Sequence, residues 1–165
     1  MKRIAKIDSI IIDELHSGNE LCMCVYDREI NKMLITDLYC LWIFDDGSVK
    51  SYVDYPVLEQ KNFESIKSLV HRYIDCTGIK LNDMHSQLTV PASNYFVRKP
   101  RSRKRVLVGF ESNTEKYWIQ KRYIDTFDGC KFFASEDKPF CPILAKRNGN
   151  LVGIVIPMHT GGTLS

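Results

Sequence analysis

The dipeptide Asn148-Gly149, set between two apolar runs, is the feature that most constrains how this chain folds. Asn-Gly is the strongest short signal for a two-residue β-hairpin, because both central residues of a type I′ turn need a positive φ. The flanking runs are PILAKR and NLVGIVI, which are short and apolar. The sequence therefore predicts an antiparallel hairpin that ends at Pro157.

Further segments rich in β-branched and aromatic residues predict more strands. They are LCMCVY (21–26), LITDLYCLWIF (34–44, one or two strands), SVKSYVDY (48–55), RVLVGF (105–110) and CKFFAS (130–135). Asp45-Asp46-Gly47 predicts a turn before the third of these segments. Residues 79–100 are expected to be less regular, because Pro91 and Pro100 make a continuous strand unfavourable.

Three segments have apolar residues spaced three or four apart, and each predicts an amphipathic helix. They cover residues 7–18, 62–78 and 119–129. Asp8 or Ser9 is the expected cap of the first helix, and Asn62 is the expected cap of the second.

Length and composition fit one globular domain over 1–165, with a flexible tail at 160–165. The chain is 44% apolar and 26% charged, which argues against disorder. No apolar run approaches the ~20 residues of a bilayer-spanning helix, so we expect no membrane association. The six cysteines lack C-x-x-C spacing, which favours buried free thiols over metal ligands and fits a reducing cytoplasm.

Six cations lie within one eight-residue run, RKPRSRKR at 98–105, which we expect to form a basic loop. The whole chain carries a net charge of +3, so the remaining residues are acidic on balance. Such a run gains affinity for a phosphate backbone by releasing its counterions. A solvated surface loop and a nuclear-targeting string are the alternatives. The candidate nucleic-acid contacts are Arg98, Lys99, Arg101, Arg103, Lys104 and Arg105.

The sequence contains none of the common catalytic motifs. Walker loops, G-x-G-x-x-G, H-E-x-x-H and G-x-S-x-G are all absent. The four histidines are scattered, and Asp45-Asp46 precedes a glycine, which is typical of a turn rather than of a carboxylate pair. We therefore expect no catalytic residue, no metal and no cofactor.

Four segments together carry a family resemblance. They are ITDLYCL (35–41), WIQKRYI (118–124), PIL (142–144) and IVIPMH (154–159). In turn, they resemble the alanine-threonine-aspartate-glycine-x-arginine-leucine strand, a short helix, a proline-bearing strand and the valine-methionine-proline-methionine-arginine ending of bacterial DNA polymerase sliding clamps (the β subunit). The chain departs from the clamp pattern at Leu38, Cys40 and His159.

The resemblance implies a clamp-like α+β domain, with an antiparallel sheet and two or three helices. In clamps, the first and last of these segments line an apolar pocket for short peptides from polymerases and repair proteins. Carried over by position, the pocket residues are Thr36, Leu38, Leu41, Ile154, Ile156, Pro157 and Met158. The alternative is that the aliphatic members of this set are core strand residues.

These observations favour a non-enzymatic, clamp-like binding module of the kind that a phage or mobile element carries. It would act on DNA-associated machinery through a protein partner and nucleic acid, and self-association is also open. The first alternative is an inhibitor of a host nucleic-acid enzyme, as anti-CRISPR proteins are. A nuclease is the second alternative.

Overall fold

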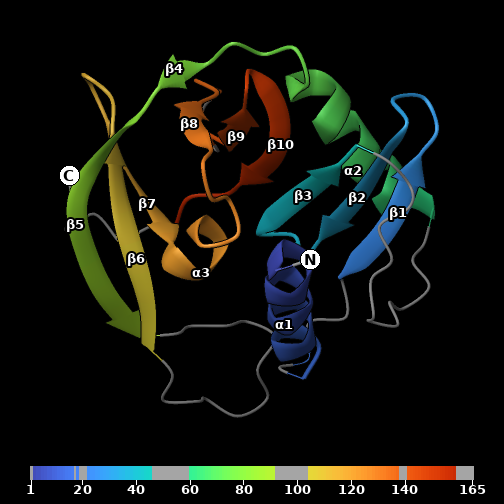
Figure 1. Ribbon diagram of the computed structural model, residues 1–165, viewed down its shortest axis with the longest axis horizontal. Coiled ribbons are helices and arrows are strands. Elements are labelled where there is room, and N and C mark those ends of the chain that lie inside the picture. Colours follow the sequence, from blue (N-terminus) through green and yellow to red (C-terminus); the bar gives the residue numbers. More distant parts are fainter. Residues whose placement is uncertain are drawn as a thin grey trace.

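Three helices and two antiparallel sheets form the described part of this computed structural model, which covers residues 2–16, 18, 22–45, 60–91, 104–137 and 141–158 (Figure 1). The helices are α1 (Lys2–His16), α2 (Gln60–Tyr73) and α3 (Lys121–Ile124). The larger sheet has the order β1 (Met23–Asp27), β2 (Lys32–Thr36), β3 (Cys40–Phe44), β10 (Asn150–Val155), β9 (Ile143–Arg147), β8 (Lys131–Ala134) and β4 (Ile79–Lys80). The smaller sheet has the order β5 (Asn82–Pro91), β6 (Lys104–Glu111) and β7 (Lys116–Gln120). The expected α+β class is confirmed.

Strand β10 joins the two halves of the larger sheet. It pairs with β9 across the Asn148-Gly149 turn, whose φ angles of 52° and 80° are those of a type I′ hairpin. On its other edge it pairs with β3, where Ile154 lies opposite Leu41. The predicted hairpin is therefore confirmed, and its second strand is central to the sheet.

The larger sheet is buried on both faces. Neighbouring residues of a strand point to opposite faces, so Leu34 and Ile35 belong to different cores. The residues of the core that α2 covers are Leu34, Leu41, Ile43, Val70, Tyr73, Leu144, Leu151 and Ile154. On the opposite face, α1, α3 and the smaller sheet complete a larger core around Trp42, Tyr123 and Phe132.

Two expected helix starts are wrong. Helix α1 begins at Lys2, so Asp8 lies inside it and is buried. Helix α2 begins at Gln60, two residues before the expected cap at Asn62. In both cases the apolar stripe indicated the helix, but polar residues extend it at its N-terminal end.

Three strands were missed: β4, β5 and β7. Ile119 belongs to β7 rather than to a helix, and α3 covers only 121–124. A short apolar run fits both periods, and here pairing with β6 decides. Strand β5 runs through a segment that was expected to be irregular. It tolerates Pro91 because it is an edge strand and the proline stands at its end.

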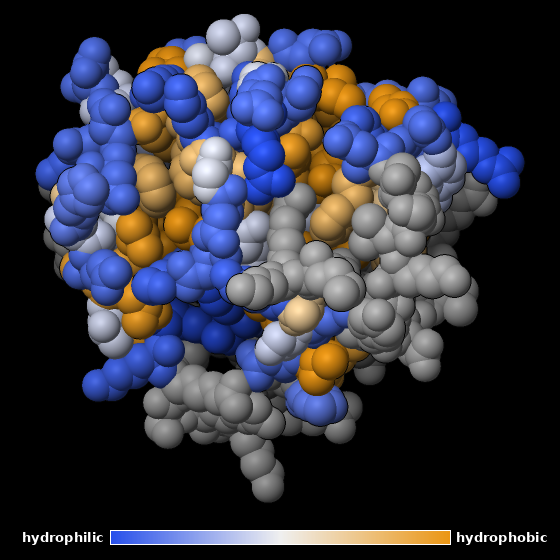
Figure 2. Space-filling view, in the orientation of Figure 1, coloured by the Kyte–Doolittle hydropathy of each residue, from blue (hydrophilic) through white to orange (hydrophobic). Residues whose placement is uncertain are grey.

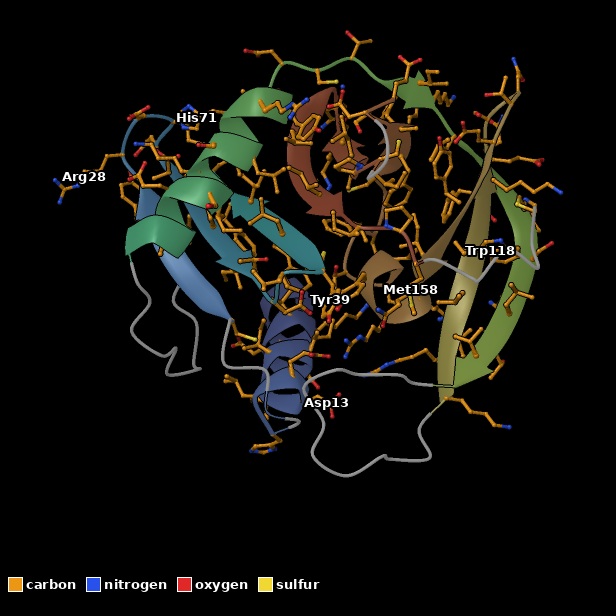
Figure 3. The ribbon with its side chains drawn as sticks, turned by 180° about the vertical axis from the view of Figure 1, so that it is seen from behind. Asp13, Arg28, Tyr39, His71, Trp118 and Met158 are labelled. Carbon is orange, nitrogen blue, oxygen red and sulfur yellow. The ribbon has the colours of Figure 1, made fainter. Side chains whose placement is uncertain are left out.

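The segment after β10 connects the two sheets. The backbone N–H of Ile156 donates to the Tyr39 carbonyl at 2.9 Å, and the N–H of Met158 donates to the Trp118 carbonyl at 2.8 Å (Figure 3). Tyr39 precedes β3 in the larger sheet, and Trp118 lies in β7 of the smaller one. Residues 156–158 therefore tie one sheet to the other.

Several expectations fall outside the described residues. They concern the turn after Asp45, the strand at 48–55, the basic residues 98–103 and the tail at 160–165. Among the described helices, none has the length and apolar character needed to cross a membrane.

Candidate functional site

A pocket between the start of β6 and α3 is lined by four cationic side chains. Its lining residues are Lys104, Arg105, Val106, Gln120, Lys121, Arg122 and Asp125, and its volume is about 230 Å³. Sites for drug-sized molecules measure roughly 300–1,000 Å³. The pocket is therefore suited to one small anionic group rather than to a whole organic cofactor.

Strand pairing brings these cations together. Leu107 of β6 lies opposite Gln120 of β7, and α3 begins at the next residue, Lys121. The cations at the start of β6 thus lie beside those of α3. In Figure 2, strongly hydrophilic side chains gather in the region between the lower end of β6 and α1.

A buried carboxylate on α1 serves two of the arginines. The side chain of Glu14 is 1% exposed, and its Oε1 accepts a hydrogen bond from an Nη atom of Arg122. The same oxygen lies 3.7 Å from an Nη atom of Arg105. Asp13 adds a second carboxylate, with Oδ2 at 3.5 Å from Arg122. One face of α1 therefore positions both guanidinium groups.

The two arginines differ in how well their charges are compensated. Burial, followed by the nearby charge of Arg122, lowers the pKa of Arg105, and Glu14 offsets this only in part. Burial also opposes the charge of Arg122, but Tyr123 and Glu14 outweigh it and the net pKa is raised. Arg122 is thus firmly held as a cation, whereas Arg105 is poorly compensated.

A hydrogen-bonded chain continues from Arg122 into the core. Arg122 donates to the Tyr123 hydroxyl at 3.0 Å, and that hydroxyl donates to Oδ2 of Asp37 at 2.6 Å. Oδ1 of Asp37 accepts the backbone N–H groups of residues 39 and 40, both at 2.9 Å. Burial raises the pKa of Asp37 to about 6, against the opposing effects of the Tyr123 hydrogen bond and the Arg122 charge. The Asp37 turn is therefore linked to the pocket.

Of the six predicted nucleic-acid contacts, the structure describes Lys104 and Arg105. They are the first two residues of β6, where Lys104 is exposed and Arg105 is largely buried beside Glu14. Sequence reasoning missed Lys121, Arg122 and Glu14. No local pattern marks them, because Glu14 and Arg122 are 108 residues apart in the chain.

The first and the last of the four segments that carry the sequence resemblance lie side by side. Leu41 and Ile154 lie opposite each other in β3 and β10. The backbone N–H of Ile156 donates to the carbonyl of Tyr39, which follows Leu38. Leu41 and Ile154 are only 2% and 1% exposed and pack in the core that α2 covers. Thr36 is equally buried. These three side chains offer no surface to a peptide, so the core interpretation holds for Leu41 and Ile154.

The other four residues of the expected peptide pocket are accessible in different degrees. Leu38 is 39% exposed and has a φ of 77°, in a region that bulky residues rarely adopt. The Thr36 hydroxyl holds this turn by accepting the Leu38 N–H at 2.9 Å. Ile156, Pro157 and Met158 are half-buried.

A second polar cluster lies at the opposite side of the larger sheet. Nε2 of His71 on α2 is 2.8 Å from Oδ2 of Asp27, whose side chain is fully buried at the end of β1 (Figure 3). Oδ1 of Asp27 accepts the backbone N–H of Glu29 at 3.0 Å. These bonds tie α2 to the β1–β2 turn. Across the described ranges, no group of three or more His, Cys, Asp or Glu side chains is arranged to hold a metal ion.

No protein-family model matches this chain, and neither does any curated protein or solved structure. The resemblance to sliding clamps thus stays a prediction from the sequence.

Proposed function

We propose that this chain is a non-enzymatic module that binds nucleic acid through the basic surface around β6 and α3. The observation that carries the proposal is the convergence of four cations, from two separate elements, on one pocket that continues the basic run at 98–105. A phosphate backbone that follows this surface would release counterions and gain affinity without base contacts.

The excess positive charge lies on the β6 side of the pocket. Lys121 is neutralised by Asp125, whose two oxygens lie 2.8 and 3.1 Å from its Nζ. Among the residues that the structure describes, Arg122 forms ion pairs with Glu14 and Asp13, whereas Arg105 forms one with Glu14 alone. Lys104 has no ion pair with any residue in the described ranges. The basic run therefore meets the pocket at its two least compensated cations.

Duplex binding and its salt dependence test this function. Replacing Arg101, Arg103, Lys104 and Arg105 by Gln should weaken binding to unrelated duplexes alike. The slope of log K against log salt should flatten by roughly 0.9 per lost contact. The matched control replaces Arg28, Lys80, Lys116 and Lys131 by Gln, which removes the same charge at exposed positions outside the pocket.

Two results would refute nucleic-acid binding at this surface. One is the absence of duplex binding by the unmodified protein at ~50 mM salt, where such contacts are strongest. The other is an equal loss of affinity in the control variant. Metal-dependent cleavage of the duplex would instead favour the nuclease alternative.

A protein contact is proposed at the Leu38 turn and the adjoining segment 156–158. Its support is the backbone bond from Ile156 to Tyr39, which holds the exposed Leu38 turn against this half-buried apolar segment. The partner would belong to the DNA-associated machinery of a cell that hosts a phage or mobile element. All six cysteines are free, which supports a reducing, cytoplasmic setting. A stable complex with one host nucleic-acid enzyme in the absence of DNA would favour the inhibitor alternative.

A further inference from the structure

Arg105 is a largely buried cation whose hydrogen-bond donors are unused by the described residues. Its side chain is 19% exposed, and its ion pair with Oε1 of Glu14 spans 3.7 Å, which is too long for a hydrogen bond. A guanidinium has five N–H donors, and Arg105 lines the pocket with donors that no described side chain takes up. An anionic acceptor in the pocket could therefore form charge-assisted hydrogen bonds to Arg105.

Arg122, by contrast, is held by several side-chain hydrogen bonds. It bonds to Glu14, to the Gln120 side chain at 3.1 Å and to the Tyr123 hydroxyl, and its guanidinium lies 4.9 Å from the centre of the Tyr123 ring. These contacts hold Arg122 in place. Because Glu14 is shared, they also hold the carboxylate that lies beside Arg105. The pocket thus combines one held guanidinium with one that has donors to offer.

We infer that this pocket is a discrete subsite for a single phosphate group, with Arg105 as the recognising residue and Glu14 and Arg122 as positioning residues. The inference rests on the proposed function and adds that binding there is a built contact rather than diffuse attraction. A guanidinium fork binds phosphate oxygens in pairs, and Lys104 at the pocket edge adds a point charge. Together the two leave a net positive charge at the pocket for one phosphate group.

Titration with inorganic phosphate at constant ionic strength tests the subsite in the full chain. Phosphate should raise the melting temperature saturably, whereas equal concentrations of acetate or chloride should not. Arg105→Lys keeps the charge but loses the fork, so it should weaken phosphate binding about tenfold or more. Lys131→Gln, at an exposed position on β8, is the control and should leave binding unchanged. Equal responses to phosphate and acetate, or unchanged binding by Arg105→Lys, would overturn the inference.

Arginine side-chain NMR gives a readout that needs no substitution at the site. On addition of phosphate to the unmodified protein, the Nε–H resonance of Arg105 should shift, while that of Arg122 should move far less. If the Nε–H resonance of Arg105 does not shift at saturating phosphate, the inference is also overturned, whether or not the variants fold.

Duplex binding separates this inference from the proposed function. If phosphate binds through Arg105 but no duplex binds, the subsite stands, the proposed function fails, and the ligand is a small phosphate or phosphate ester. If a duplex binds while phosphate has no effect, and Arg105→Lys behaves like Lys131→Gln, the subsite fails. The proposed function then stands on the rest of the basic run.

Discussion

Gly153 in β10 lies directly against the ring of Phe127, so that a β-carbon on the glycine would come 2.2 Å from Cε1 of that ring. The carbonyl oxygen of Leu41, in the neighbouring strand, would be 3.0 Å away. Phe127 is buried and packs edge-on against Phe132, with ring centres 6.2 Å apart. The ring therefore occupies space that only glycine leaves free at the centre of the larger sheet.

Gly153→Ala should accordingly destabilise the protein by roughly 1–3 kcal/mol, the cost of overpacking a core. Urea unfolding measures the change. Adding Phe127→Leu to Gly153→Ala should recover part of the loss, because the two positions are in contact and their effects are not additive. Strictly additive effects would contradict this account of the contact.

Gly149→Val isolates the backbone cost of the hairpin turn. Gly149 has a φ of 80°, and nothing lies within 4 Å of a β-carbon placed there. Any loss of stability is therefore conformational, and we expect about 1 kcal/mol or more, because β-branched residues are strained at positive φ. The control Asn150→Val introduces the same side chain at an exposed strand position and should be near neutral. Equal melting temperatures for the two variants would argue against the type I′ turn.

The buried carboxyl of Asp37 should make stability depend on pH. Burial raises its pKa in the folded protein to about 6, above the ordinary value of ~3.9. The folded state therefore holds this proton more tightly than the unfolded chain. The resulting stabilisation, on the order of 2–3 kcal/mol, is complete below about pH 4 and is lost as the pH rises through about 6.

Denaturant unfolding of the wild type and of Asp37→Asn between pH 4 and 7.5 checks this sign. The variant cannot titrate at this position, so the stability of the wild type relative to the variant should fall across the interval. Parallel curves would mean that Asp37 does not titrate there.

Glu14→Gln should cost about 3 kcal/mol or more, because it leaves two largely buried guanidinium groups without their shared carboxylate. Asp13→Asn is the matched control on the same helix. Asp13 is 25% exposed and its Oδ2 lies 3.5 Å from Arg122, so its loss should cost under about 1 kcal/mol. Similar losses in the two variants would show that the burial of Glu14 is not the decisive factor.

Met158→Ala tests the proposed protein contact. Met158 is half-buried and its backbone, not its side chain, makes the bond to Trp118. The variant should stay folded and lose about 1–2 kcal/mol of partner affinity, the scale of a truncated interface anchor. A stability loss of about 2–5 kcal/mol with affinity unchanged would identify Met158 as a core residue instead.

Elements with a complete local signal were predictable from the sequence. The Asn148-Gly149 turn specifies its own φ angles, and the stripe from Ile66 to Tyr73 has one period only. Strand β7 was missed because Ile119 fits two periods and its pairing with Val108 of β6 decides between them. Local pattern fixes such elements only when a single period fits.

The candidate site was less predictable than the fold. The charged run indicated Lys104 and Arg105, but Glu14 reaches them only through the packing of α1, which no local pattern encodes. Leu41 and Ile154 are apolar strand residues, and the sequence pattern of such a residue is the same whether it faces a ligand or a covering helix. Only the position of α2 distinguishes the two.

Because β10 is the last described strand in the sequence and lies between β3 and β9, the larger sheet can be completed only late in synthesis. Strands β1 to β3 can pair with one another as they leave the ribosome, but the outer edge of β3 has no partner until β10 follows. An open strand edge is a site of mispairing. We expect the nascent chain to remain sensitive to protease until residues 150–155 have emerged, and the amides of β3 and β10 to gain protection from hydrogen exchange in one step.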